Sequence, residues 1–182
     1  MLSDATRVIV AASPYWIAGS IWLNEKRIQD ILKDSNTNFM RFTDVQIYAD
    51  ADRTSCVAAL PYAMVPKDRI ELVILPEARH EAPVKRWNNY NVRTSAKVSA
   101  IVSRYYIEGQ LQLPPSTLDV MHALTQQLGS FFPIIGASIV AADSKRMRVP
   151  VVFANKRFLS CFNTDDAANS EDGAAEMESS LS

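Results

Sequence analysis

The chain has 182 residues, of which 48% are hydrophobic, and a formal net charge of −1 at pH 7. This hydrophobic content is typical of a globular protein with a core, and it excludes a chain that is disordered throughout. No apolar run approaches the ~18 residues that a membrane-spanning helix needs. Residues 1–7 lack the basic start and long apolar stretch of a signal peptide. We therefore expect a cytoplasmic protein without a membrane span.

Charge is unevenly distributed along the chain. Residues 164–182 hold six of the 20 acidic residues and none of the 19 basic ones. Residues 1–163 therefore carry 14 acidic and 19 basic side chains, a formal charge of +5. The final segment also has no aromatic residue, so it cannot bury enough apolar surface to become ordered. We expect residues 164–182 to be a disordered acidic tail on a mildly basic body.

Two strands are expected at the start of the chain. Residues 7–12 form a short run with β-branched side chains, which predicts a strand. A serine–proline turn follows. Residues 15–23 then alternate strictly, with Gly19 on one face and Trp16 and Trp22 on the other. This period of two predicts a second strand that pairs with the first.

A short helix and three further strands complete the first half. Ile28, Ile31 and Leu32 have helical spacing, which predicts a helix within residues 25–33, with Asn24 as its N-cap. The strand candidates that follow are residues 39–48, 56–65 and 69–75.

The same pattern recurs after a polar, irregular segment at residues 76–95, which is typical of a linker. Residues 105–113 repeat the pattern of residues 15–23 at an offset of 90 residues, about the size of a small domain. A helix with Leu118, Met121, Leu124 and Leu128 on one stripe, ended by Gly129, then precedes strand candidates at 131–141, 147–154 and 157–162. We expect a first repeat at 6–75 and a second at 96–163.

The repeated strand carries a glycine at the same position in both halves, Gly19 and Gly109. A glycine inside a strand often marks a sharp bend or a close approach of another backbone. A five-stranded antiparallel sheet with a strongly bent second strand closes into a small barrel. We therefore expect a mainly β protein with short helices (α+β), built from two small β-barrel units. Each unit would have the order strand, strand, helix, three strands.

This pattern resembles the Sm-like small β-barrels. The resemblance is carried by Val8-Ile9-Val10, Ile17-Ala18-Gly19-Ser20-Ile21, Phe42-Thr43-Asp44-Val45 and Lys67-Asp68-Arg69-Ile70-Glu71-Leu72-Val73. The unit is also similar to an uncharacterised bacterial domain family that tends to occur as two copies. The family's helix precedes its first strand, whereas here it follows the second. The loops that bind RNA in the family read Asn24-Glu25-Lys26-Arg27 and Pro66-Lys67-Asp68-Arg69 here, so no RNA-binding residue is carried over.

Signatures of catalysis are absent from the sequence. There is no Walker A loop, dinucleotide fingerprint or nucleophile elbow. His80 and His122 have no companions at metal-ligand spacing. We expect no enzyme activity, no cofactor and no metal. A remaining alternative is an enzyme with a site between the repeats, built from Arg41, Asp44 and His122.

Two features favour binding. Trp16, Trp22 and Tyr106 lie off the inward-facing register, where aromatic side chains can stack on nucleobases or anchor a protein partner. The alternative is that they pack against the helix, the linker or the other repeat. Lys85, Arg86 and Trp87 place basic and aromatic residues together in the expected linker, as phosphate contact and base stacking require.

The leading hypothesis is a non-enzymatic binding or scaffolding protein whose two repeats bind another protein or further copies of the chain. The alternative is a protein that binds RNA or single-stranded nucleic acid. Its acidic tail would compete with nucleic acid for the basic surface. Removing the tail would then strengthen binding and steepen its salt dependence.

Overall fold

The structure is a computed structural model that describes residues 5–77, 95–113, 119–141 and 146–164. The first half contains β1 (Ala5–Ala12), β2 (Tyr15–Trp22), α1 (Ile28–Lys33), β3 (Phe39–Tyr48), β4 (Cys56–Pro66), the 3-10 turn η1 (Lys67–Arg69) and β5 (Leu72–Leu75). The second half contains β6 (Ser95–Val102), β7 (Tyr105–Gln112), α3 (Val120–His122), the π-helical turn η2 (Ala123–Gln127), β8 (Phe131–Ala141), β9 (Met147–Asn155), the 3-10 turn η3 (Lys156–Phe158) and β10 (Leu159–Thr164). The expected mainly β class is confirmed. Most of the expected linker, and residues 165–182 of the expected tail, lie outside the described residues. The predicted start of the tail at residue 164 is wrong, because Thr164 is the buried last residue of β10.

The ten strands within the described residues belong to one antiparallel sheet, in the order β10-β6-β7-β8-β9-β5-β1-β2-β3-β4. The prediction of two closed barrels is wrong. β5 pairs with β9 of the other half, from Leu72↔Ala154 to Leu75↔Val151. In a closed first barrel, β4 would pair with the second edge of β5. Here β9 pairs with that edge instead, so the sheet stays open. β4 and β10 are its two ends.

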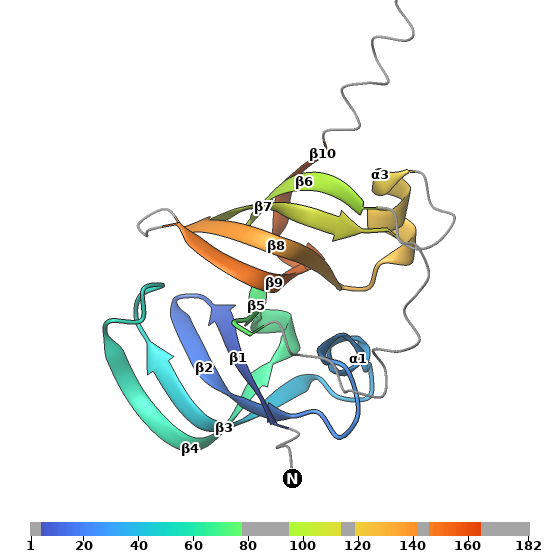
Figure 1. Cartoon of the computed structure of the whole chain (residues 1–182). Helices are drawn as coiled ribbons and strands as arrows, with labels where there is room; N and C mark the ends of the chain where they lie inside the picture. Colours follow the sequence, from blue (N-terminus) through green and yellow to red (C-terminus); the bar gives the residue numbers. More distant parts are fainter. Residues whose placement is uncertain (1–4, 78–94, 114–118, 142–145, 165–182) are drawn as a thin grey trace, which may run out of the picture.

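The two halves lie on either side of the β5–β9 pair (Figure 1). In that view β1 to β4 form the lower half, and β6, β7, β8 and β10 form the upper half. α1 and α3 lie on the same side of the molecule, each beside its own half. Each half has the expected order of two strands, a helical segment and three strands, with a 3-10 turn before the last strand.

Two apolar clusters form the core, and each takes side chains from both halves. The first-half core, around Phe42, takes Phe131, Val151 and Phe153 from the second half. The second-half core, around Phe132, takes Ile9, Ala11, Trp16, Ala18, Leu72 and Ile74 from the first half. Successive side chains of a strand point to opposite faces, so the strands at the junction supply both clusters. Separating the halves would therefore expose both cores.

Each helical segment begins directly after an N-cap residue. α1 has Arg27 as its N-cap. The predicted cap Asn24 is wrong, because its φ of 47° places it in the preceding turn. α3 follows Asp119, whose side chain accepts a hydrogen bond of 2.8 Å from the backbone N–H of Met121. This is the ordinary N-cap contact of an aspartate.

The two repeated glycines allow neighbouring strands to approach closely, as expected. A Cβ at Gly19 would lie 3.1 Å from the carbonyl oxygen of Thr43. A Cβ at Gly109 would lie 2.5 Å from Cγ2 of Ile134. The pairing register of β2 with β3, and of β7 with β8, shifts at these glycines. The close approach therefore coincides with a bulge, which increases the local bend of the sheet.

A polar cluster is buried at the junction of the halves. Glu71 is only 4% exposed, and its carboxylate accepts hydrogen bonds of 2.9 Å from the hydroxyls of Ser13 and Ser103. These serines occupy the corresponding turns of the two halves, β1–β2 and β6–β7. Asn155, 3% exposed, donates from Nδ2 to the carbonyl of Ile70 at 2.7 Å. Through these hydrogen bonds, Glu71 links both turns to the β5–β9 junction.

A lysine caps the helical segment of each half from the following 3-10 turn. Nζ of Lys67 donates to the carbonyls of Ile31 and Asp34 at 2.6 and 2.8 Å. Nζ of Lys156 donates to the carbonyl of Leu128 at 2.6 Å. Burial lowers the pKa of both ammonium groups from the ordinary value of 10.5. These lysines satisfy carbonyls at helix C-termini, which have no partner within the helix.

Candidate functional site

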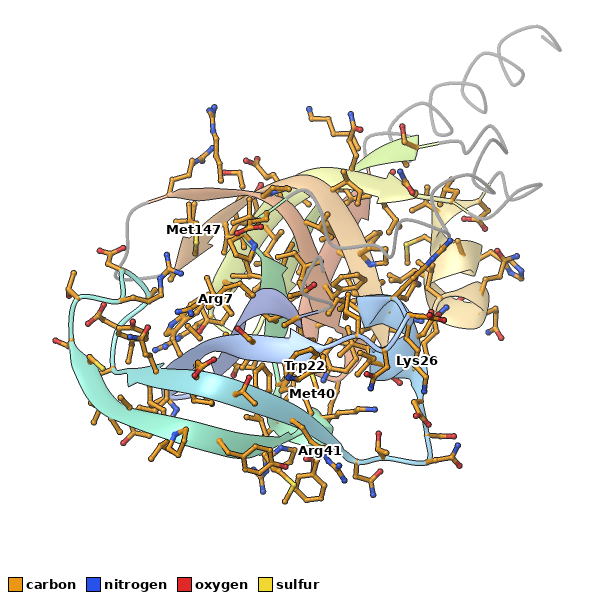
Figure 2. The ribbon with its side chains drawn as sticks, turned by 60° about the horizontal axis from the view of Figure 1, so that its bottom comes forward. Arg7, Trp22, Lys26, Met40, Arg41 and Met147 are labelled. Carbon is orange, nitrogen blue, oxygen red and sulfur yellow. The ribbon has the colours of Figure 1, made fainter. Side chains whose placement is uncertain are left out.

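β4 forms one end of the sheet and, among the described strands, pairs only with β3. Its outer edge is therefore a row of backbone groups available to another strand. Large hydrophobic side chains are exposed on it and at the start of β3: Phe39, Val57, Leu60, Tyr62 and Met64. Figure 2 brings this edge forward, with Arg41 on the outer side of β3 and the buried Met40 directed inward. Arg41 lies opposite Met64 in the β3–β4 pair.

The pairing of β3 with β4 has the same register as the pairing of β8 with β9. The pair Met40↔Val65 corresponds to Phe132↔Ala154, and Arg41↔Met64 corresponds to Pro133↔Phe153. Segment 62–65 of β4 therefore matches segment 151–154 of β9 position by position. The latter is the segment that pairs with β5. The corresponding segment of β4 lies at the end of the sheet.

We call Phe39, Tyr62 and Met64 the β4 face. Its side chains are 46%, 49% and 53% exposed, respectively. The matching residues of the second half, Phe131, Val151 and Phe153, are 3%, 4% and 4% exposed and belong to the first-half core. The same positions thus form a buried contact in one half and an exposed apolar face in the other. An exposed apolar face on an edge strand is typical of a binding site for another polypeptide.

Prolines delimit the part of β4 that can accept a strand. Pro61 and Pro66 have no N–H and cannot donate to a neighbour, whereas all four residues between them have one. In an antiparallel strand alternate residues direct their backbone groups to opposite edges, so two of these four face the outer edge. In β9, Pro150 precedes the segment that pairs with β5 in the same way. β5 pairs with β9 over four positions. The segment available on β4 therefore has the length that the chain already uses at its own junction.

The structure separates the aromatic residues that the sequence grouped as a binding surface. Trp16 is fully buried, and its ring makes an edge-to-face contact with Tyr105 of the other half at 5.3 Å between centroids. The expectation that Trp16 faces outward is therefore wrong, and the alternative of packing against the other repeat holds for this residue. Trp22 and Tyr106 are 56% and 40% exposed, on strands of different halves. The remaining members, Lys85, Arg86 and Trp87, lie outside the described residues.

A groove of about 870 Å³ lies where the two halves meet. It is lined by the end of α1, both 3-10 turns and the start of β8, including the basic residues Lys33, Lys67, Arg69 and Arg157. Lys67 is engaged in capping α1. Arg157 lies 3.9 Å from the carboxylate of Asp68. Because part of the positive charge is balanced within the groove, its attraction for a phosphate backbone is reduced.

A smaller cavity of about 240 Å³ lies beside Trp16. Asp52, Arg53 and Arg146 also line it. The indole N–H of Trp16 is buried and has no hydrogen-bond partner among the described residues. Arg146 is held by Glu108, at 3.5 Å between the guanidinium and the carboxylate. The cavity is therefore small and mixed in charge.

The residues of the enzyme alternative do not come together in a pocket. Arg41 and Asp44 lie on β3, whereas His122 lies on α3 of the other half, and none of the three lines the groove. Within the described ranges, no group of three histidine, cysteine or acidic side chains is placed to hold a metal ion. No helix in the part of the chain that the structure describes is long and apolar enough to cross a membrane.

Comparisons with models of known protein families, with curated proteins and with solved structures find no match for this chain. The candidate site therefore rests on the geometry of β4 and on its correspondence with β9.

Sequence reasoning missed the β4 face, although a signal was present. Strands were predicted at residues 56–65 and 147–154, which contain the similar segments Leu60-Pro61-Tyr62-Ala63-Met64-Val65 and Val149-Pro150-Val151-Val152-Phe153-Ala154. Both segments are apolar, so the pattern alone does not say which one is covered. Strand order decides this, and a single sequence does not reveal it.

Proposed function

We propose that the protein is a non-enzymatic binding or scaffolding protein that binds a polypeptide along the outer edge of β4. The single observation that carries the proposal is the exposure of the β4 face beside a segment free of proline. An added strand would gain backbone hydrogen bonds along residues 62–65, and the apolar face would give it side-chain contacts. Tyr62 and Met64 are the anchors, because they lie on that segment and are about half exposed.

The duplicated Sm-like architecture belongs to this proposal. It is supported by the recurring order of elements, by the matched register of β3–β4 and β8–β9, and by the equivalent lysines of the 3-10 turns. On this reading two units of one kind are joined through β5 and β9. The first unit keeps its β4 edge for a partner.

Site-specific photo-crosslinking in the full chain tests the proposed function. A benzophenone amino acid replaces Met64 in one variant and Val57 in a control, since both residues are exposed on β4 but lie on opposite sides of Pro61. We expect a polypeptide adduct from position 64 that is lost when Tyr62→Lys is added. Absence of any polypeptide adduct at position 64, or equal adducts at both positions, would contradict the proposal.

The second candidate function is binding of RNA or single-stranded nucleic acid. The basic residues of the groove favour it. The test is the ratio of absorbance at 260 and 280 nm across the chromatographic peak of freshly purified protein. A nucleic-acid-rich ratio that collapses after high salt and nuclease supports this function, and a clean protein spectrum opposes it. On this reading, deletion of residues 165–182 tightens binding and steepens its salt dependence, because six acidic side chains are removed.

A further inference from the structure

We propose that the polypeptide bound by β4 carries an acidic side chain opposite Met64, where it pairs with Arg41. This inference rests on the proposed function and specifies the chemistry of the partner. It concerns one row of side chains that crosses the sheet on the face that carries Arg41, called the outer face here. The row runs from Trp22 on β2 through Arg41 on β3 to Met64 on β4. The equivalent row of the second half continues into β5, where a strand is already in place.

Arg41 lies in the middle of this row and points to the outer side of β3 (Figure 2). It is opposite Met64 in the β3–β4 pair. On its other side, the pair Ser20↔Thr43 places Trp22 opposite Arg41 two residues further along, because antiparallel partners change by equal and opposite steps. Trp22 and Met64 are 56% and 53% exposed, and Arg41 is exposed as well. Large apolar side chains therefore flank the guanidinium on both sides.

The guanidinium of Arg41 has no hydrogen-bond or ion-pair partner among the described residues. By contrast Arg7, on the same face, donates to the side-chain oxygen of Gln46 at 3.1 Å. A strand added beside β4 would lie about 10 Å from β3, two strand spacings away, and would exclude water from part of the row. Removing water from a charged group without supplying a partner is costly. The added strand should therefore bring an acceptor for Arg41.

The β5–β9 junction contains the same row with a different middle residue. Pro133 takes the place of Arg41, and Phe153 takes that of Met64. Val73 of β5 lies opposite Phe153, in the position of the added residue. Because the side chain of Pro133 has no polar group, the apolar Val73 completes that row without leaving a donor unpaired. With an arginine on the third strand, the same position calls for an acceptor instead of an apolar side chain.

A carboxylate is the acceptor that suits this position. Arginine binds a carboxylate through two parallel N–H···O bonds, which are stronger than hydrogen bonds between neutral groups. The Cα of a residue opposite Met64 would lie about 10 Å from that of Arg41. Two long side chains meet across this gap over the flexible side chain of Met64, so we expect glutamate more often than aspartate. The apolar neighbours Trp22 and Met64 limit the access of water and strengthen the ion pair.

The neighbouring positions of the partner call for apolar side chains. The next outer position of the added strand lies opposite Tyr62, which is 49% exposed. The residue between these two positions points to the inner face, opposite Ala63, which packs against the first-half core. The expected partner is therefore an extended apolar segment with a single acidic residue, and not an acidic tract.

Selection from a phage-displayed library of random decapeptides tests the inference with the full chain. Peptides are selected on immobilised wild-type protein and counter-selected against Met64→Lys, which places a charge on the β4 face. We expect the enriched peptides to share one acidic residue with apolar residues on both sides. Selection on Arg41→Glu should replace that acidic residue by lysine or arginine, because the charge on the third strand is reversed.

A synthetic peptide of the enriched sequence then measures the ion pair by fluorescence anisotropy. Replacing its acidic residue by glutamine should weaken binding to the wild type about tenfold, but should change binding to Arg41→Gln by less than about twofold. Arg7→Gln is the matched control. It removes the same charge from an exposed site of the same face, but on β1, three strands from β4, so the tenfold difference should remain. Circular dichroism and urea unfolding check that each variant is folded.

A charge preference that reverses with Arg41→Glu, and a difference that depends on Arg41 but not on Arg7, would support the inference. If Arg7→Gln removed the difference as Arg41→Gln does, net charge would be its cause and the inference would be wrong. If the enriched peptides bind the wild type but not Met64→Lys, and show no preference for an acidic residue, the acidic partner is wrong while the proposed function survives. If no peptide is enriched on the wild type over Met64→Lys, both are overturned.

Discussion

The hydrogen bonds of Glu71 offer the sharpest test of how the two halves are held together. Its carboxylate is 4% exposed and accepts from Ser103 and Ser13, each at 2.9 Å. Ser103→Ala removes one of these donors while leaving the carboxylate buried. The φ of 54° at Ser103 is a strain that alanine shares with serine, so the change isolates the hydroxyl.

The expected magnitude follows from the surroundings of the two serines. A hydrogen bond to a charged group contributes about 1.5–3 kcal/mol, and we expect that loss for the half-buried Ser103. Ser13 is exposed, so water can replace its hydroxyl and Ser13→Ala should cost about 0.5–1 kcal/mol. At about 2–4 °C per kcal/mol for a chain of this size, Ser103→Ala should lower Tm by about 3–12 °C. The double variant should cost more than the sum, because both donors serve one buried carboxylate.

Urea and thermal unfolding followed by circular dichroism measure these differences. Ser35→Ala, at an exposed serine of the α1–β3 loop, is the control and should stay within about 0.5 kcal/mol of the wild type. If Ser103→Ala and Ser13→Ala both stayed within that range, at an unchanged m-value, the reasoning about the buried carboxylate would be refuted. The order of the two effects is a second check, since a larger loss at Ser13 would show that exposure does not govern them.

Three further predictions concern the fold and the surface. Gly109→Ala should lower the free energy of unfolding by about 1–3 kcal/mol, because its Cβ would lie 2.5 Å from Ile134. Gly19→Ala, with its nearest contact at 3.1 Å, should cost less, and the opposite order in urea unfolding would contradict the packing argument. Lys67→Met should cost about 1.5–3 kcal/mol in the same assay, since the carbonyls of Ile31 and Asp34 at the end of α1 lose the ammonium group that donates to them, and a loss below about 0.5 kcal/mol would contradict that capping role. Trp22→Ala should change the unfolding free energy by less than about 0.5 kcal/mol, because the side chain is 56% exposed on β2, and a larger loss in urea unfolding would contradict that exposure.

Local features of the fold could be predicted from the sequence. The alternation of residues 15–23 gave the correct strand at β2, and the helical spacing of Ile28, Ile31 and Leu32 gave α1. Gly19 and Gly109 indicated the close approach of strands that the structure contains. These signals depend on neighbouring residues and on the period of each element, so one chain is sufficient to read them.

Strand order and burial could not be predicted in the same way. Trp16 and Trp22 share one face of β2 by period, yet Trp16 is buried against Tyr105 whereas Trp22 is exposed. The difference arises because the second half covers only one end of β2. Likewise, the five antiparallel strands expected in each half could have closed into a barrel. The pairing of β5 with β9 prevented it, and that pairing joins residues about 80 positions apart.

The position of β5 also has a consequence for synthesis on the ribosome. β5 is the last strand of the first half, and its four residues Leu72–Leu75 are all buried. One of its edges pairs with β1, but the other stays unpaired until β9 is synthesised, about 70 residues later. During that interval the nascent chain has a wholly apolar strand at the edge of an incomplete sheet, a state prone to pairing with neighbouring chains. The first half can collapse early, but its most hydrophobic strand is protected only when translation of the second half is nearly complete.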